Sequence, residues 1–211
     1  MIKTILKACA CSAIIALASC SGSGSSTPGE TAASSAADAA IEAIMTRTSV
    51  RAYTDSAVSE AQTETLLRAA MAAPTAVNKQ PWRFVVIRDR ALLDTIAANF
   101  QSMQMMRQAP MAVVVCGDMK ATLEGEAQAY WAQDCSAATE NLLVAANAMG
   151  LGTVWCGVYP KSDRVAKFKE LLSLPSEIIP LNCIAVGYPA EKPEPKDKWK
   201  PEYVHYNSWG D

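Results

Sequence analysis

Short strands that are apolar along their whole length set the architecture of this chain. Residues 111–116 read Met-Ala-Val-Val-Val-Cys, a stretch without a polar side chain. Successive side chains of a strand point to opposite faces of its sheet, so a strand that is apolar at every position is buried on both faces. The sequence therefore predicts one sheet with helices on both of its faces.

Helical and strand patterns alternate along most of the chain. Apolar residues recur at helical spacing in residues 38–45, 59–73, 92–100, 126–149 and 164–172. Strand patterns occupy residues 84–87, 111–116, 153–158 and 183–186. In the second helix, Ser59 and Gln62 have the spacing of a capping box. This mixture predicts an α+β or α/β sandwich around one sheet.

Composition excludes several classes of protein. The chain has 211 residues, of which 50% are hydrophobic and 19% are charged. That is enough for one domain with a real core, and it excludes a disordered chain. The formal net charge of −2 offers no basic field for nucleic acid. The seven cysteines are arranged neither as a disulfide scaffold nor as a zinc module.

The amino terminus has the pattern of a lipoprotein leader. Lys3 and Lys7 precede an apolar stretch that is too short for a membrane-spanning helix and that ends in Leu-Ala-Ser-Cys at Cys20. This tetrapeptide resembles the bacterial lipobox, where cleavage precedes the cysteine and lipid is added to it. We predict a signal peptide over residues 1–19 and lipidation of Cys20. The alternative is an ordinary secretory signal in which Cys20 is incidental.

The segment that starts at Cys20 has the composition of a flexible tether, and lipid on Cys20 would determine where the protein is located. Residues 20–35 are mostly small and polar, so they are expected to form a flexible tether, with the folded domain over residues 36–211. Acyl chains on Cys20 would anchor the protein to a bacterial membrane. We therefore expect it at the cell envelope, facing the periplasm or at the surface.

The first of three polar clusters spans residues 47–53. Arg47 and Arg51 flank the hydroxyl groups of Thr48 and Ser49. Guanidinium groups make permanently charged, bidentate contacts and hydroxyl groups add donors, a combination that suits a phosphate or another anion. The alternative is a pair of solvated arginines near a helix end.

The second cluster is the loop at residues 73–82. Thr75, Asn78 and Gln80 supply a hydroxyl and two carboxamides directly before a predicted strand. Carboxamides both donate and accept, so they can read the edge of a heterocycle. The alternative is a polar turn in which Trp82 fills the core.

The third cluster is the glycine-rich stretch at residues 150–158. A helix ends there, a strand follows, and glycine recurs where a flat ligand could meet bare backbone. Taken alone, this is also an ordinary helix-to-strand turn.

Together, and in this order, the three clusters resemble the flavin-dependent nitroreductase family. The resemblance covers nearly all of residues 38–211, and includes Asp134 with Asn-Leu-Leu from Asn141 in the long helix and the closing stretch at 187–193. It implies an α+β, three-layer sandwich with a central, mainly antiparallel sheet flanked by helices. It also implies a homodimer that binds one FMN in each of two interface sites, and no metal.

The resemblance assigns roles to individual residues. Arg47 and Ser49 would hold the FMN phosphate or ribityl chain, and Arg51 and Asn78 would face the pyrimidine edge. The full set of implied cofactor-binding residues is Arg47, Thr48, Ser49, Arg51, Pro74, Thr75, Asn78, Gln80, Trp155, Cys156, Gly157, Lys196 and Lys198. The chemistry would take place on FMN, so no catalytic side chain is expected. Cys156 is expected to be an inert buried thiol, with a redox role as the alternative.

The resemblance also implies a reaction. Family members take hydride from NAD(P)H and pass it to nitroaromatic, quinone or similar acceptors in a ping-pong cycle. NAD(P)H is not normally free outside the cytoplasm, so an exported enzyme would need another envelope donor. The alternative function is a non-catalytic, flavin-binding envelope lipoprotein.

Overall fold

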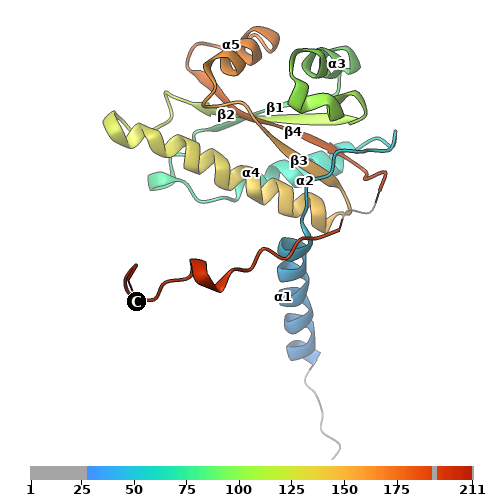
Figure 1. Ribbon diagram of the computed structural model, residues 1–211, viewed down its shortest axis with the longest axis vertical. Helices are drawn as coiled ribbons and strands as arrows, with labels where there is room; N and C mark the ends of the chain where they lie inside the picture. The colour runs from blue at the N-terminus through green and yellow to red at the C-terminus, as the bar shows by residue number, and fades with distance from the viewer. Residues whose placement is uncertain (1–27, 192–193, 211) are drawn as a thin grey trace, which may run out of the picture.

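Four strands form the central sheet of the molecule (Figure 1). The computed structural model describes residues 28–191 and 194–210, so the predicted signal peptide and Cys20 lie outside the described residues. The strands are β1 (Trp82–Ile87), β2 (Met111–Asp118), β3 (Gly152–Gly157) and β4 (Ile178–Gly187). Their spatial order is β1-β2-β4-β3, and every neighbouring pair is antiparallel. The expected antiparallel sheet is therefore confirmed.

Strand β2 lies inside the sheet and is buried on both faces, as its composition predicts. Val113 and Val115 pack into the core on one face, whereas Val114 and Cys116 pack into the core on the other. Strand β4 is longer than the predicted 183–186. Its first half contains Pro180, which a regular central strand disfavours, and the structure places this proline at a β-bulge opposite Cys116.

Helices cover both faces of the sheet, so the molecule has the three layers expected (Figure 1). One face carries α3 (Arg90–Asn99), the 3-10 segment η2 (Gln101–Arg107) and α5 (Ser162–Leu171). The other carries α2 (Glu60–Met71) and α4 (Tyr130–Ala148). The remaining short 3-10 helices are η1 (Ala76–Asn78), η3 (Gly125–Ala129) and η4 (Pro201–Tyr203).

The capping box predicted for α2 is present. The Gln62 backbone N–H donates to Ser59 Oγ at 3.2 Å, and the Ser59 N–H donates to Gln62 Oε1 at 3.0 Å. This reciprocal pair satisfies two backbone donors that a helix start otherwise leaves open, which is why the helix begins where the sequence indicates.

Helix α1 (Pro28–Thr46) begins earlier than predicted. The sequence interpretation had a tether to residue 35 and a helix only from residue 38, but the described part of that tether is helical. Alanine has the highest helix propensity, and residues 32–43 are rich in it, while proline is well tolerated in a first helical turn. The small side chains were interpreted as a sign of a flexible tether, but in the described residues they form part of helix α1.

Large exposed apolar side chains are concentrated on α1 and on the carboxyl-terminal segment among the described residues. On α1, Ile41, Ile44 and Met45 are 61%, 54% and 68% exposed. The carboxyl-terminal segment 194–210 extends away from the sandwich (Figure 1). Its exposed aromatic residues are Trp199, Tyr203, Tyr206 and Trp209. Clusters of exposed apolar side chains are common at protein interfaces.

Candidate functional site

The structure brings the first and third polar clusters side by side. Ser49 forms a parallel bridge with Thr153 of β3, and the Val50 N–H donates to the Thr153 carbonyl at 2.9 Å. This contact requires Gly152, because a Cβ there would lie 2.7 Å from the Cβ of Val50. The segment after α1 is therefore held along the outer edge of β3.

Beyond Thr153, no other described strand pairs with the outer edge of β3. The Val158 N–H donates to the Leu181 carbonyl of β4 at 3.0 Å, while Thr153 uses its carbonyl on the outer side. Backbone groups alternate along an edge strand, so Trp155 and Gly157 also point their N–H and C=O groups outward. A Cβ on Gly157 would meet no atom within 4 Å. The outward backbone groups are thus next to a sheet face that is open at Gly157.

The hydroxyl and guanidinium groups of the first cluster lie beside this edge. Arg47 is 18% exposed and forms an ion pair with Glu140 of α4, with Nε and Oε1 3.2 Å apart. Thr48 is half-buried, whereas Ser49 and Arg51 are exposed. Arg47 is thus fixed against α4 and is not a solvated helix cap. The segment offers polar groups and positive charge to an anion.

The second cluster forms a loop with an unusual backbone. Val77, Asn78 and Gln80 have φ values of 50°, 54° and 50°, in the left-handed region. A β-branched residue rarely adopts this region, and such conformations concentrate at functional sites. Inside the loop, the Gln80 N–H donates to Thr75 Oγ1 at 3.1 Å, and Gln80 Nε2 donates to Asn78 Oδ1 at 2.9 Å.

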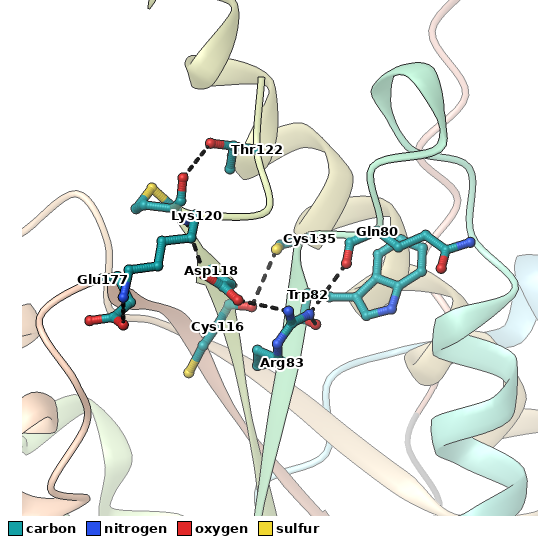
Figure 2. A network of polar contacts seen from close by, with 10 residues as sticks. Gln80, Trp82, Arg83, Cys116, Asp118, Lys120, Thr122, Cys135 and Glu177 are labelled. Atoms are coloured by element: carbon teal, nitrogen blue, oxygen red, sulfur yellow. Dashed lines mark hydrogen bonds and ion pairs between the residues drawn. The ribbon is translucent and has the colours of Figure 1, made fainter. Parts of the chain in front are cut away.

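Both ends of this loop are tied to the fold. The Ala76 N–H donates to Oδ1 of buried Asp134 on α4 at 2.8 Å. Trp82 is buried in the core, as the alternative interpretation of the loop proposed. Figure 2 shows the other tie, in which Arg83 Nη1 donates to the Trp82 carbonyl at 2.8 Å and Nη2 pairs with Asp118 Oδ2 at 2.7 Å.

Arg83 is a positioning contact that the sequence interpretation missed. An arginine on an edge strand ordinarily has a solvated side chain, so the position of Arg83 in the sequence did not indicate this contact. The Asp118 N–H also donates to the Pro81 carbonyl at 2.8 Å, so the end of β2 holds the loop through both backbone and side chain.

In the described part of the chain, polar contacts do not link all the predicted site residues. Among the residues that the structure describes, no hydrogen bond or ion pair links the loop at 74–81 with the segment 47–53 or with β3. Pro74 and Thr75 belong to that loop. Lys196 and Lys198 are exposed on the extended carboxyl-terminal segment. Among the described residues, polar contacts within one chain therefore join the first and third clusters but not the second.

Cys156 lies beneath η2, with Sγ 3.9 Å from Met105 Sδ. Burial raises the pKa of this thiol to about 11, so it is protonated near neutral pH. A protonated, buried thiol is a poor nucleophile, which favours the inert role over the redox role.

Comparison with known proteins agrees with this arrangement. The chain matches the model described as the nitroreductase family over residues 44–104 and 97–188. It is 43% identical, over 80% of this chain and 87% of the relative, to a provisionally named NADH dehydrogenase/NAD(P)H nitroreductase of Methanothermobacter thermautotrophicus. It is 30% identical to the oxygen-insensitive NADPH nitroreductase of Salmonella typhimurium, over 80% of this chain and 74% of the relative.

A solved structure adds a bound ligand to the comparison. The crystal structure of a provisionally named nitroreductase from Desulfovibrio desulfuricans, in complex with FMN, superposes with a TM-score of 0.70. The two proteins are 31% identical, and the match covers 81% of this chain and 97% of that one.

The predicted location at the cell envelope was wrong. The relatives are named for reductions that use NADH or NADPH, whereas an envelope protein was expected to need a different donor. The error came from giving a tetrapeptide at Cys20 more weight than the chemistry of the whole domain. No helix in the described part of the chain is long and apolar enough to cross a membrane.

Proposed function

The chain belongs to the nitroreductase family, and on that premise we propose that it is an FMN-dependent oxidoreductase that uses NAD(P)H. The observation that carries the proposal is the outer edge of β3, where the N–H groups of Trp155 and Gly157 point outward and no other described strand pairs, beside the polar segment from Arg47 to Arg51. A flat heterocycle needs backbone donors at its edge and a path for its anionic tail, and this edge supplies both.

The residues of this edge have separate roles in the proposal. Arg47, Thr48 and Ser49 hold the phosphate or ribityl chain through charge-assisted and hydroxyl hydrogen bonds. The positive charge of Arg51 faces the pyrimidine edge. The Gly157 amide is directed at the ring, and the missing side chain leaves room for it. When bound, FMN supplies the hydride chemistry, which no side chain here needs to perform.

We propose that a second copy of the chain completes the site. Asn78 and Gln80 make no polar contact with β3 in their own chain, and Lys196 and Lys198 lie on a segment that extends away from it. A groove of about 670 Å³ between α1, α2 and α4 is lined mainly by alanine, which allows close backbone approach. With the apolar face of α1 at Ile44, it forms a surface suited to a homodimer.

The proposed acceptors are nitroaromatic or quinone-like compounds. The space beside Gly157 borders bare backbone and the partly exposed ring of Trp155, so it favours flat molecules. Donor and acceptor would occupy this space in turn, which gives a ping-pong cycle.

Titration of the purified chain with FMN tests the proposal, with flavin fluorescence and light scattering as readouts. The proposal expects saturable binding of one FMN per chain and a mass of two chains. A chain that binds no FMN contradicts the function, and a monomer that binds FMN fully contradicts the shared site.

A further inference from the structure

Arg164, on the first turn of α5, contacts three segments at once. Its Nη1 donates to the Gly157 carbonyl at 2.8 Å, and its Nη2 donates to Ser102 Oγ of η2 at 3.1 Å. Its guanidinium carbon also lies 6.0 Å from the ring centroid of Phe100. One planar cation therefore connects the end of β3, η2 and the end of α3.

The direction of the Gly157 carbonyl places this cation at the outer edge of β3. In a strand, the N–H and C=O of one residue point to the same side, so the carbonyl that Arg164 contacts and the Gly157 N–H share that edge. The guanidinium is thus beside the backbone amide to which we assign the FMN ring.

Two positive charges act on the neighbouring thiol of Cys156. Although burial raises the pKa of Cys156 to about 11, the positive charges of Arg51 and Arg164 both oppose that rise. Arg51 comes from the first polar cluster and Arg164 from α5. Both charges therefore act on the same short stretch of β3.

We propose that Arg164 is a positioning residue for bound FMN. It fixes the Gly157 peptide at the ring edge, adds a permanent positive charge there, and fastens η2 over the neighbouring Cys156. This inference rests on the proposed function and names a residue that the three sequence clusters do not contain.

The charge of Arg164 should affect the midpoint potential of bound FMN, which can be measured. Reduction places negative charge on the flavin, and a fixed cation nearby favours the reduced form. Removing the cation should therefore weaken the binding of reduced FMN more than the binding of oxidised FMN. We expect Arg164→Gln to lower the preference for reduced FMN about tenfold, which corresponds to a midpoint potential about 30 mV more negative.

Matched variants separate charge from packing. Arg164→Lys keeps the charge, so its midpoint potential should stay near that of the wild type. Arg107→Gln removes an exposed cation of η2 whose side chain contacts Gln104, so it should not shift the potential. If Arg164→Gln does not fold, Arg164→Met tests the same loss of charge and keeps the stem over Phe100. An unshifted potential in the neutral variant overturns the proposal, as does an equal shift in Arg107→Gln.

A second readout needs no FMN. Hydrogen exchange of the backbone amides of η2 in the FMN-free protein should be faster in Arg164→Gln, Arg164→Lys and Ser102→Ala, because each loses part of the fork between η2 and β3. Unchanged exchange in all three variants overturns the role in fastening η2. A wild-type chain without FMN affinity would instead contradict the proposed function, so the two failures are distinguishable.

Discussion

The Val50 N–H donates to the Thr153 carbonyl at 2.9 Å, which joins two motifs that are distant in the sequence. This bond holds the segment after α1 against β3 at Thr153, and the segment then pairs with residues 188–190, where the Ala190 N–H donates to the Ala52 carbonyl at 3.0 Å. The hydroxyl of Ser49 and the charge of Arg51 are thereby brought to the edge that we assign to FMN.

The close approach at Gly152 gives the first prediction. Gly152→Ala places a Cβ 2.7 Å from the Cβ of Val50, so the backbone must shift, and we expect a loss of about 1–3 kcal/mol in the free energy of unfolding. Chemical denaturation measures it. Gly157→Ala is the matched control, because its Cβ meets nothing within 4 Å. It should keep its stability and bind FMN more weakly; equal destabilisation of the two variants would contradict this account.

Arg47→Ala should weaken FMN binding without unfolding the chain. A hydrogen bond to a charged group contributes about 1.5–3 kcal/mol, so the Kd should rise about 10- to 150-fold. Glu140 loses its ion-pair partner in this variant, but its side chain is half exposed and can be solvated. Arg68→Ala removes an exposed arginine paired with Glu64 on α2 and serves as the control. An unchanged Kd in Arg47→Ala would remove Arg47 from the site.

Asp134→Ala should loosen the loop that follows α2. The variant leaves the Ala76 N–H without its buried acceptor, at an expected cost of about 1–3 kcal/mol in unfolding free energy. Hydrogen exchange at Ala76 should accelerate. Asp134→Asn retains a carbonyl acceptor and should exchange more slowly than the alanine variant. Identical exchange in all forms would show that Asp134 does not hold the loop.

Alkaline pH should destabilise the fold through its buried thiols. Burial raises the pKa of Cys116 to about 12 from an ordinary value of 9.0, so the folded state binds more protons than the unfolded state between these values. The stabilising effect is complete below pH 9 and is lost as the pH rises towards 12. Cys116→Ala should reduce the slope of unfolding free energy by about 1.4 kcal/mol per pH unit in that range. An unchanged slope would contradict this.

Much of the fold could be predicted because local patterns and burial agreed. The apolar run at 111–116 became the central strand β2, and Ser59 with Gln62 marked the start of α2. The start of α1 was missed because alanine and serine are common both in tethers and in helices. Half of β4 was missed because Pro180 is compatible with a strand only at a bulge, which depends on its neighbour.

The candidate site was less predictable because its contacts are long-range. Motif order indicated a common site, but sequence spacing could not show that Thr153 pairs with the segment before Arg51. Nor could it show that Arg164 reaches back to Gly157. An arginine at the start of an amphipathic helix is ordinarily solvated. The contact between Arg164 and Gly157 becomes visible only once the fold places α5 beside the end of β3.

Anaerobic addition of NADH or NADPH to the FMN-loaded chain tests the central claim most directly. The account predicts that the visible absorption of the bound flavin is lost on mixing and returns when a quinone or nitroaromatic compound is added. A bound flavin that keeps its absorption with both nicotinamides, under conditions where dithionite reduces it, would contradict the proposal that this chain is an NAD(P)H-dependent oxidoreductase.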